Sequence, residues 1–255
     1  MDDTTGGWKR ESDFSRRKRL IIIVAVVVAV FGALVVVASI TQRSGEPAAG
    51  PASSTAPSSA AAGPRPDELQ MVRRDPKDPM AMGDIDAPVV LVLWTDLRCP
   101  FCAVFNREVL PQIEREYIQT GKIRLEVTDV AFFGEQSEKA GAAAAAAGRQ
   151  GKYFAFIKAV YGEAPEKGHP DLPRERLVYF AKKAGVPDMA RFEKDLDDEK
   201  LVVDVQAATA EAQQLTVSSV PFFVAGRSAL AGAQPIETFR KYLDDAVRTA
   251  AKQPR

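Results

Sequence analysis

Residues 89–102 read VVLVLWTDLRCPFC, and this stretch decides the fold. Its first part, Val89–Thr95, is apolar, rich in β-branched residues and preceded by Pro88, which predicts a buried strand. After the short turn 96–98, apolar residues recur at helical spacing across residues 100–119. The chain's two cysteines, Cys99 and Cys102, therefore stand where a buried strand gives way to a helix.

That position favours thiolate chemistry. Backbone N–H groups of a first helical turn lack intrahelical partners, and the positive end of the helix dipole lies there, so Cys99 should ionise readily. The spacing of three residues brings Cys102 to the same face, close enough for a disulfide. Pro100 costs the helix little at its first position. We expect Cys99 to be the exposed nucleophile and Cys102 the buried partner.

Cys-x-x-Cys is also half of a zinc site, and the remaining ligands would then have to be His169 and carboxylates. Copper held by two thiolates and methionine would use Met80 or Met82. Two inert buried cysteines are a third alternative. We expect His169 to be a surface residue, the methionines to be packing residues, and the protein to use neither metal nor cofactor.

The remainder of the domain completes an α/β pattern. Residues 123–130 alternate at strand period, and residues 222–224 and 228–230 predict a hairpin. Residues 136–215 are mostly helical, and a last amphipathic helix begins at Pro235. Strands and helices alternate at both ends of this pattern, which predicts an α/β sheet with an inserted helical subdomain at about 136–215.

An apolar run precedes this domain. Leu20–Ile40 holds 21 residues without a charge, enough to span roughly 30 Å of hydrocarbon as a helix. Four basic residues, Arg16–Arg19, adjoin its start, which predicts a single-pass anchor with a cytoplasmic N-terminus and an extracytoplasmic domain. The alternatives are a signal peptide cut near Val37–Ser39 and a buried soluble helix.

Composition predicts the remaining organisation. Residues 1–19 form a polar arm, residues 41–66 an Ala/Ser/Pro/Gly-rich linker, and residues 67–255 the folded domain. The 255 residues carry 34 basic and 34 acidic side chains, so the net charge gives no reason to expect nucleic acid as a partner. Both cysteines lie in one motif and none is left for a structural bridge, which suits a protein that handles disulfides outside the cytoplasm.

Three motifs in this order resemble the DsbA family. The first is the segment 83–117, with Asp86-Ala87-Pro88 and Thr95-Asp96-Leu97-Arg98 before the cysteines; the others are Val220-Pro221-Phe222-Phe223 and Gly232-Ala233-Gln234-Pro235. The resemblance covers about residues 75–250 and implies a thioredoxin-like fold with a helical insertion. It implies that Pro221 is cis and lies beside the reactive cysteine, and that Val220, Pro100 and Phe101 contact a bound peptide.

The resemblance also implies a function. We expect a monomeric dithiol oxidase that introduces disulfides into exported, reduced proteins and is reoxidised by a membrane redox partner. The site residues are then Cys99, Cys102 and Pro221. The alternatives are a tethered reductase or isomerase, and a binding or metal-delivery module that uses the fold without turnover.

Two positions depart from the family pattern. Leu93 stands six residues before Cys99, where the family commonly has a buried acid that relays protons. Phe101 replaces a histidine found in strong oxidases, and phenylalanine cannot donate a hydrogen bond to a thiolate. Asp96 is the nearest carboxylate in sequence, and we expect it to be a surface cap of the turn.

Overall fold

The computed structural model describes residues 69–252. The predicted arm 1–19, membrane span 20–40 and linker 41–66 lie outside the described residues. Within residues 69–252, none of the helices combines the length and the apolar character needed to cross a membrane.

The fold is built on a five-stranded sheet with the order β1-β3-β2-β4-β5. β2 (Val89–Thr95) and β3 (Ile123–Asp129) are parallel, and the other neighbours are antiparallel. The edges are β1 (Ala81–Met82) on one side and the hairpin of β4 (Phe222–Ala225) and β5 (Ser228–Ala231) on the other. β2, β3 and the hairpin were predicted, whereas the two-residue β1 is too short for a periodic signal.

The first helix follows Cys99 directly and is continuous but irregular. It runs through α2 (Pro100–Val104), the π-helical turn η2 (Phe105–Val109), α3 (Leu110–Ile113) and a second π-helical turn, η3 (Glu114–Ile118). Pro111 lies inside α3, where it has no N–H for a helical hydrogen bond. The prediction of a helix over residues 100–119 is confirmed.

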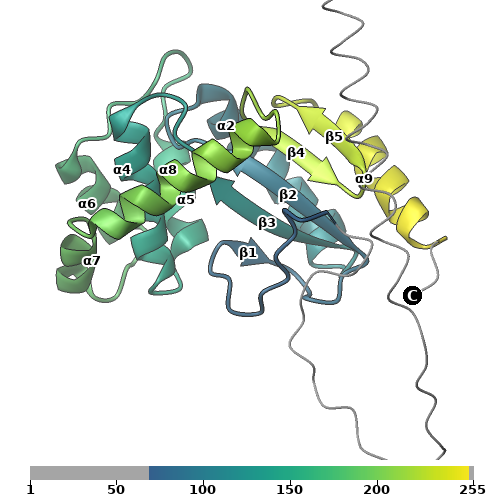
Figure 1. Ribbon diagram of the computed structural model, residues 1–255, viewed down its shortest axis with the longest axis horizontal. Helices are drawn as coiled ribbons and strands as arrows, with labels where there is room; N and C mark the ends of the chain where they lie inside the picture. The colour runs from purple at the N-terminus through teal and green to yellow at the C-terminus, as the bar shows by residue number, and fades with distance from the viewer. Residues whose placement is uncertain (1–68, 253–255) are drawn as a thin grey trace, which may run out of the picture. The chain divides into compact units, whose positions relative to one another are not determined.

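The helical insertion lies between β3 and β4, as predicted. It consists of α4 (Glu135–Gly148), α5 (Tyr153–Gly162), α6 (Arg174–Lys183), α7 (Met189–Asp195) and α8 (Glu199–Gln214). The final helix is α9 (Ile236–Ala250). Figure 1 shows the insertion gathered at one end of the sheet, with the hairpin and α9 at the other.

The alanine-rich part of α4 is closely packed, as expected. Five of the six alanines in residues 142–147 are buried. A Cβ on the neighbouring Gly141 would lie only 3.0 Å from Val205 of α8 and 3.4 Å from the Cβ of Asp129. Small side chains thus allow α4 to approach both α8 and the end of β3.

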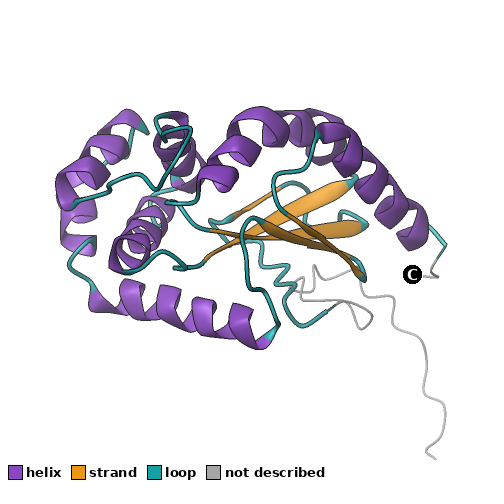
Figure 2. Cartoon of the chain, turned by 90° about the horizontal axis from the view of Figure 1, so that it is seen from above, coloured by secondary structure: helices purple, strands orange, loops and turns teal. Residues whose placement is uncertain are grey.

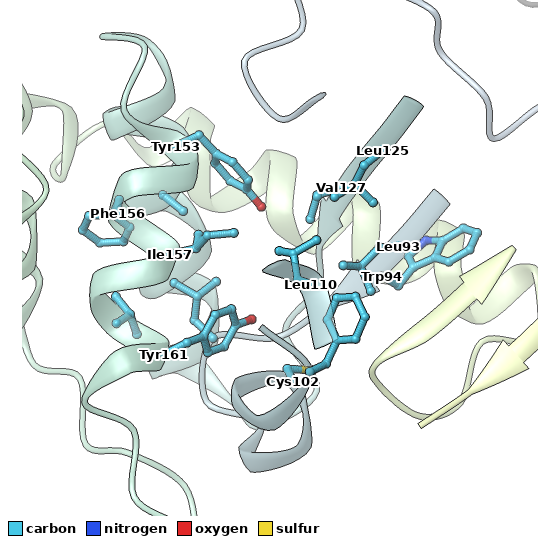
Figure 3. Close-up of a cluster of buried hydrophobic side chains, with 14 of the residues drawn as sticks. Leu93, Trp94, Cys102, Leu110, Leu125, Val127, Tyr153, Phe156, Ile157 and Tyr161 are labelled. Carbon is cyan, nitrogen blue, oxygen red and sulfur yellow. The ribbon is translucent and has the colours of Figure 1, made fainter. Parts of the chain in front are cut away.

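One face of the central strands is covered by helices. Phe223 of β4, Phe105 of the first helix and Phe239 of α9 form an aromatic cluster, with ring centroids 4.7–5.3 Å apart. Leu93, the register partner of Phe223 and of Val127, lies on this same face. Figure 3 shows Leu93 and Val127 facing α5 in one apolar cluster with Cys102.

The opposite face of β3 is buried although its side chains are charged. Glu126 accepts hydrogen bonds from the backbone N–H groups of Arg73 (2.7 Å) and Arg74 (2.8 Å), and pairs with Arg124 (2.9 Å). The segment before β1 therefore covers this face and supplies hydrogen-bond partners for its charged side chains. Seen from above, this side of the sheet is lined mainly by loops, whereas helices line the other (Figure 2).

Candidate active site

Cys99 is the N-cap of α2, at the carboxyl end of β2. Its sulfur accepts a hydrogen bond from the backbone N–H of Cys102 at 3.4 Å, and its thiol donates to the carbonyl of Val220 at 3.4 Å. The Val220–Pro221 peptide bond is cis, which confirms the expected conformation. The structure therefore brings Cys99, Cys102, Val220 and Pro221 together from motifs about 120 residues apart.

The expected exposure of Cys99 is wrong. Its exposed fraction is only 2%, and Cys102 is buried as well. The loop that carries Val220 covers Cys99, because the turn before a cis proline lies directly against its thiol. What separates the two cysteines is access: Cys99 lines a large surface cavity and Cys102 does not.

The two thiols also differ in acidity. The pKa of Cys99 is lowered, mainly because the Cys102 thiol hydrogen-bonds to its thiolate, with further help from the N–H groups of Cys102 and Phe101. Burial raises the pKa of Cys102 well above its usual value, and the neighbouring Cys99 raises it further. A hydrogen bond with Thr95 partly offsets that rise. Of the two thiols, Cys99 therefore ionises first and is the better nucleophile and leaving group.

The cavity at Cys99 has a volume of about 1070 Å³. Pro100, Phe101 and Val220 line it, together with residues of the chain between β3 and β4; these include Phe132, Phe133, His169, Gln213 and Thr216. Phe101 is 64% exposed, an unusual position for so large an apolar side chain. The three residues expected to contact substrate therefore share one wall of one cavity.

His169 is on the surface, as expected, but its place at the cavity was not foreseen. Its ring stacks on Phe133 with centroids 4.1 Å apart, and Nδ1 hydrogen-bonds to the carbonyl of Arg98 at 2.9 Å. This contact joins the loop before α6 to the turn that carries the cysteines. Seventy residues separate the partners, so local sequence holds no signal of it.

Asp96 is not a surface cap. Its exposed fraction is 0%, and it accepts hydrogen bonds from the N–H groups of Arg98 and Phe132, each at 2.8 Å. Burial raises the pKa of this carboxyl, with the hydrogen bonds acting against the rise. Asp96 thus fastens the turn before Cys99 to the loop after β3.

Within residues 69–252, no group of three or more His, Cys, Asp or Glu side chains is placed to hold an ion. Met80 and Met82 pack against the core, which confirms their assignment as packing residues.

The sequence prediction missed a set of buried polar groups behind Cys102. Thr95 hydrogen-bonds to the hydroxyl of Tyr161 at 2.7 Å, and the hydroxyl of Tyr153 donates to Asp129 at 3.0 and 3.1 Å. One signal was available for Asp129: it falls in phase with Ile123, Leu125 and Val127, on the apolar side of its strand.

Comparison with known proteins identifies relatives. A family model described as Thioredoxin matches residues 75–245. Probable disulfide bond formation protein D of Bacillus cereus is 31% identical over 145 residues, covering 55% of this chain and 67% of that protein. Its Bacillus anthracis counterpart is 30% identical over 55% of this chain and 66% of its own length. The matched segment thus spans about two thirds of these relatives.

Solved structures share the fold. Oxidised BdbD from Bacillus subtilis has a TM-score of 0.62 at 20% identity, covering 66% of this chain and 92% of that one. α-DsbA1 from Wolbachia pipientis has a TM-score of 0.60 at 22% identity, covering 68% and 92%. The sheet with its helical insertion is therefore the thioredoxin-like architecture that was expected.

Proposed function

Because the chain belongs to the thioredoxin family, among its DsbA-like thiol–disulfide oxidoreductases, we propose that it is a dithiol oxidase acting through Cys99 and Cys102. Its substrates are reduced, exported proteins, and a membrane redox partner restores its disulfide. The names of its Bacillus relatives, disulfide bond formation proteins, support this direction.

The inequality of the two thiols carries the proposal. A lowered pKa at Cys99 stabilises the reduced enzyme, and a stabilised reduced form makes the disulfide an oxidant. The stabilisation comes from N–H groups at the start of α2 and from the Cys102 thiol, so it does not require a histidine at position 101. Phe101 instead offers apolar surface to an unfolded client.

The reaction follows from the geometry. A client thiolate enters the cavity and attacks the sulfur of Cys99; the Cys99–Cys102 bond breaks and Cys102 leaves with the electron pair. A second client thiolate then attacks the client sulfur, forms the client disulfide and expels the Cys99 thiolate. Backbone groups beside the cis Pro221 hold the client chain, because Val220 is the residue whose carbonyl faces Cys99.

The equilibrium of the Cys99–Cys102 pair against glutathione tests the direction of the reaction. An oxidase should lie near the strongly oxidising end of the family, toward about −120 mV, whereas a reductase lies near about −270 mV. A value at or below that of thioredoxin would contradict the oxidase and support the reductase.

Trapping of mixed disulfides tests the roles of the two cysteines. Cys102→Ala should accumulate mixed disulfides with reduced clients, because Cys99 still attacks and no internal thiol releases it. Cys99→Ala should accumulate few. Gels run without reductant measure both variants, and equal trapping would refute the assignment.

We further propose that residues 20–40 anchor the protein in the cell membrane, with the catalytic domain on the extracytoplasmic side. The uncharged run and its basic N-terminal flank support this location. Protease added to intact cells from which the outer layers have been removed should digest the domain. An N-terminus near Ile40 in the purified native protein would show that the anchor is cleaved.

A further inference from the structure

Cys102, the thiol with the raised pKa, needs a proton when the disulfide is broken. When Cys102 leaves the disulfide it carries a negative charge in a buried, apolar site, where the charged form is strongly disfavoured. Leu93 and its register partner Val127 lie in the same apolar cluster as Cys102 and cannot exchange protons. The proton must therefore come from water or from another polar group near Cys102.

Four polar side chains gather two residues further along the strands, two of them from the strands and two from α5. Thr95 and Asp129 are register partners on the parallel strands β2 and β3, whose backbones lie about 4.8 Å apart. Each of them is hydrogen-bonded to a tyrosine of α5, Thr95 to Tyr161 and Asp129 to Tyr153. Figure 3 shows both tyrosines projecting from α5 toward the strands, with Tyr161 on the side of Cys102.

Asp129 also reaches a second cavity. This cavity, of about 370 Å³, is lined by Asp129 together with Arg73, Asp78, Gly141, Asp204 and Val205. It shares no lining residue with the cavity at Cys99. The carboxyl thus has Thr95 as its register partner on the neighbouring strand and lines a separate opening.

We propose that Asp129 is the proton donor and acceptor for Cys102, acting through the hydroxyl of Thr95, and that the second cavity joins Asp129 to solvent. The proposal rests on the proposed function, since it supplies the proton step of the same thiol–disulfide exchange. It assigns to a carboxyl at the end of β3 the role that Leu93 cannot perform.

The step balances as follows. As a thiolate attacks Cys99, a new S–S bond forms, the Cys99–Cys102 bond breaks and the electron pair moves to Cys102. Thr95 gives its hydroxyl proton to Cys102 and takes one from the Asp129 carboxyl, which becomes a carboxylate. Water at the second cavity reprotonates Asp129. During reoxidation the proton travels in reverse, and the Cys102 thiolate then attacks the mixed disulfide on Cys99.

The acidity of Asp129 suits this task. Burial raises its pKa to about 8, while the hydrogen bond from Tyr153 acts in the opposite direction. The carboxyl therefore holds a proton near neutral pH and can both lose and regain it. The charged or titratable groups around it are Asp96 after β2, Tyr153 and Tyr161 on α5, and Arg73 before β1. Asp75, Lys77, Asp78 and Asp204 line the second cavity with it, to which α4 contributes only Gly141 and Ala145.

Reduction of the oxidised protein by dithiothreitol from pH 6 to pH 9.5, with rates divided by the dithiothreitol thiolate concentration, tests the relay. The wild-type rate should be level below pH 8 and fall above it, as Asp129 loses its proton. Asp129→Asn should be about a hundredfold slower at pH 6, at the low end of general acid catalysis, and the difference should shrink to about a few fold at pH 9.5, where little of Asp129 stays protonated. Thr95→Val, which preserves side-chain shape, should show the same flattened profile.

Two further variants separate the relay from a structural role. Tyr153→Phe removes a hydrogen bond that lowers the pKa of Asp129, so the break in the profile should move to higher pH. Asp197→Asn removes an exposed charge that pairs with Arg174 and lines neither cavity, and it should leave the profile unchanged. Asp96 remains in every variant and cannot produce the difference.

The outcomes are distinct. An Asp129→Asn protein with the wild-type profile would overturn the relay while leaving the exchange reaction intact. A cysteine pair that does not exchange with dithiothreitol at all would overturn the proposed function itself.

Discussion

Strand β3 carries two buried carboxylates on opposite faces, and their surroundings are unlike. Glu126 faces the segment before β1, where it meets Arg124 and two backbone N–H groups. Asp129 faces α5, where its hydrogen-bond donor is the neutral hydroxyl of Tyr153. The first environment fixes a charge, whereas the second leaves a carboxyl that binds a proton near neutral pH.

The difference shows that burial alone does not give an acid its role. A carboxylate paired with a guanidinium and N–H groups keeps its charge and holds two segments together. A carboxyl whose hydrogen-bond partner is a hydroxyl lacks a paired charge; Arg73 lowers the pKa of Asp129, but burial raises it more, so this acid can exchange protons. Glu126 and Asp129 are only three positions apart in β3, but this spacing places them on opposite faces of the sheet.

The largest effect should come from breaking the charged side. Glu126→Gln preserves shape but leaves Arg124 buried without its counter-charge, and it should lower the free energy of unfolding by about 3–5 kcal/mol. Denaturant melts measure this loss, and dithiothreitol reduction should keep the wild-type pH profile. A loss below about 1 kcal/mol would mean that the N–H groups alone hold this face.

The pH dependence of stability should reveal the other acid. The pKa of Asp129 is raised from 3.8 to about 8 by burial, so between these values the folded protein binds more protons than the unfolded one. The stabilising contribution is complete below pH 3.8 and is lost as the pH rises to about 8. Melts at pH 5 and pH 8 should show wild type losing about 3–4 kcal/mol more than Asp129→Asn. Parallel losses in both proteins would place the titration elsewhere.

The smallest change should come from adding an acid to the helix-covered face. Leu93→Glu restores a carboxyl beneath Cys102, and it should speed reduction at neutral pH while costing about 1–3 kcal/mol of stability. Leu93→Gln is the control, because it imposes the polar cost without a titrating proton. A Glu variant that is no faster than the Gln variant would mean that position 93 does not exchange protons with Cys102.

Local pattern predicted much of this fold. Val89–Thr95 was predicted to the residue because a continuous apolar run before a turn admits few alternatives. The hairpin was predicted to within one residue at each strand end, since Gly226 marks its turn with a positive φ of 58°. The cis Val220–Pro221 bond came from family resemblance, because no property of the local sequence requires it.

The surroundings of the site could not be predicted in the same way. Asp96, expected on the surface, is buried because the loop at Phe132 folds over it, and nothing near Asp96 in sequence indicates that contact. The alternation of Arg124 and Glu126 along β3 looks like a solvated face, but the segment at Arg73 covers it. Contacts between distant segments determine burial, and burial determines what an acid does.

The separation of the two cavities has a consequence for the order of events. An unfolded polypeptide bound across Cys99 excludes water from that cavity for as long as it stays bound. The cavity at Asp129 is lined by different residues, so the bound polypeptide does not close it. Asp129 can then regain its proton while the client is still bound. The enzyme can therefore react with the first client cysteine and be released by the second without the client dissociating in between.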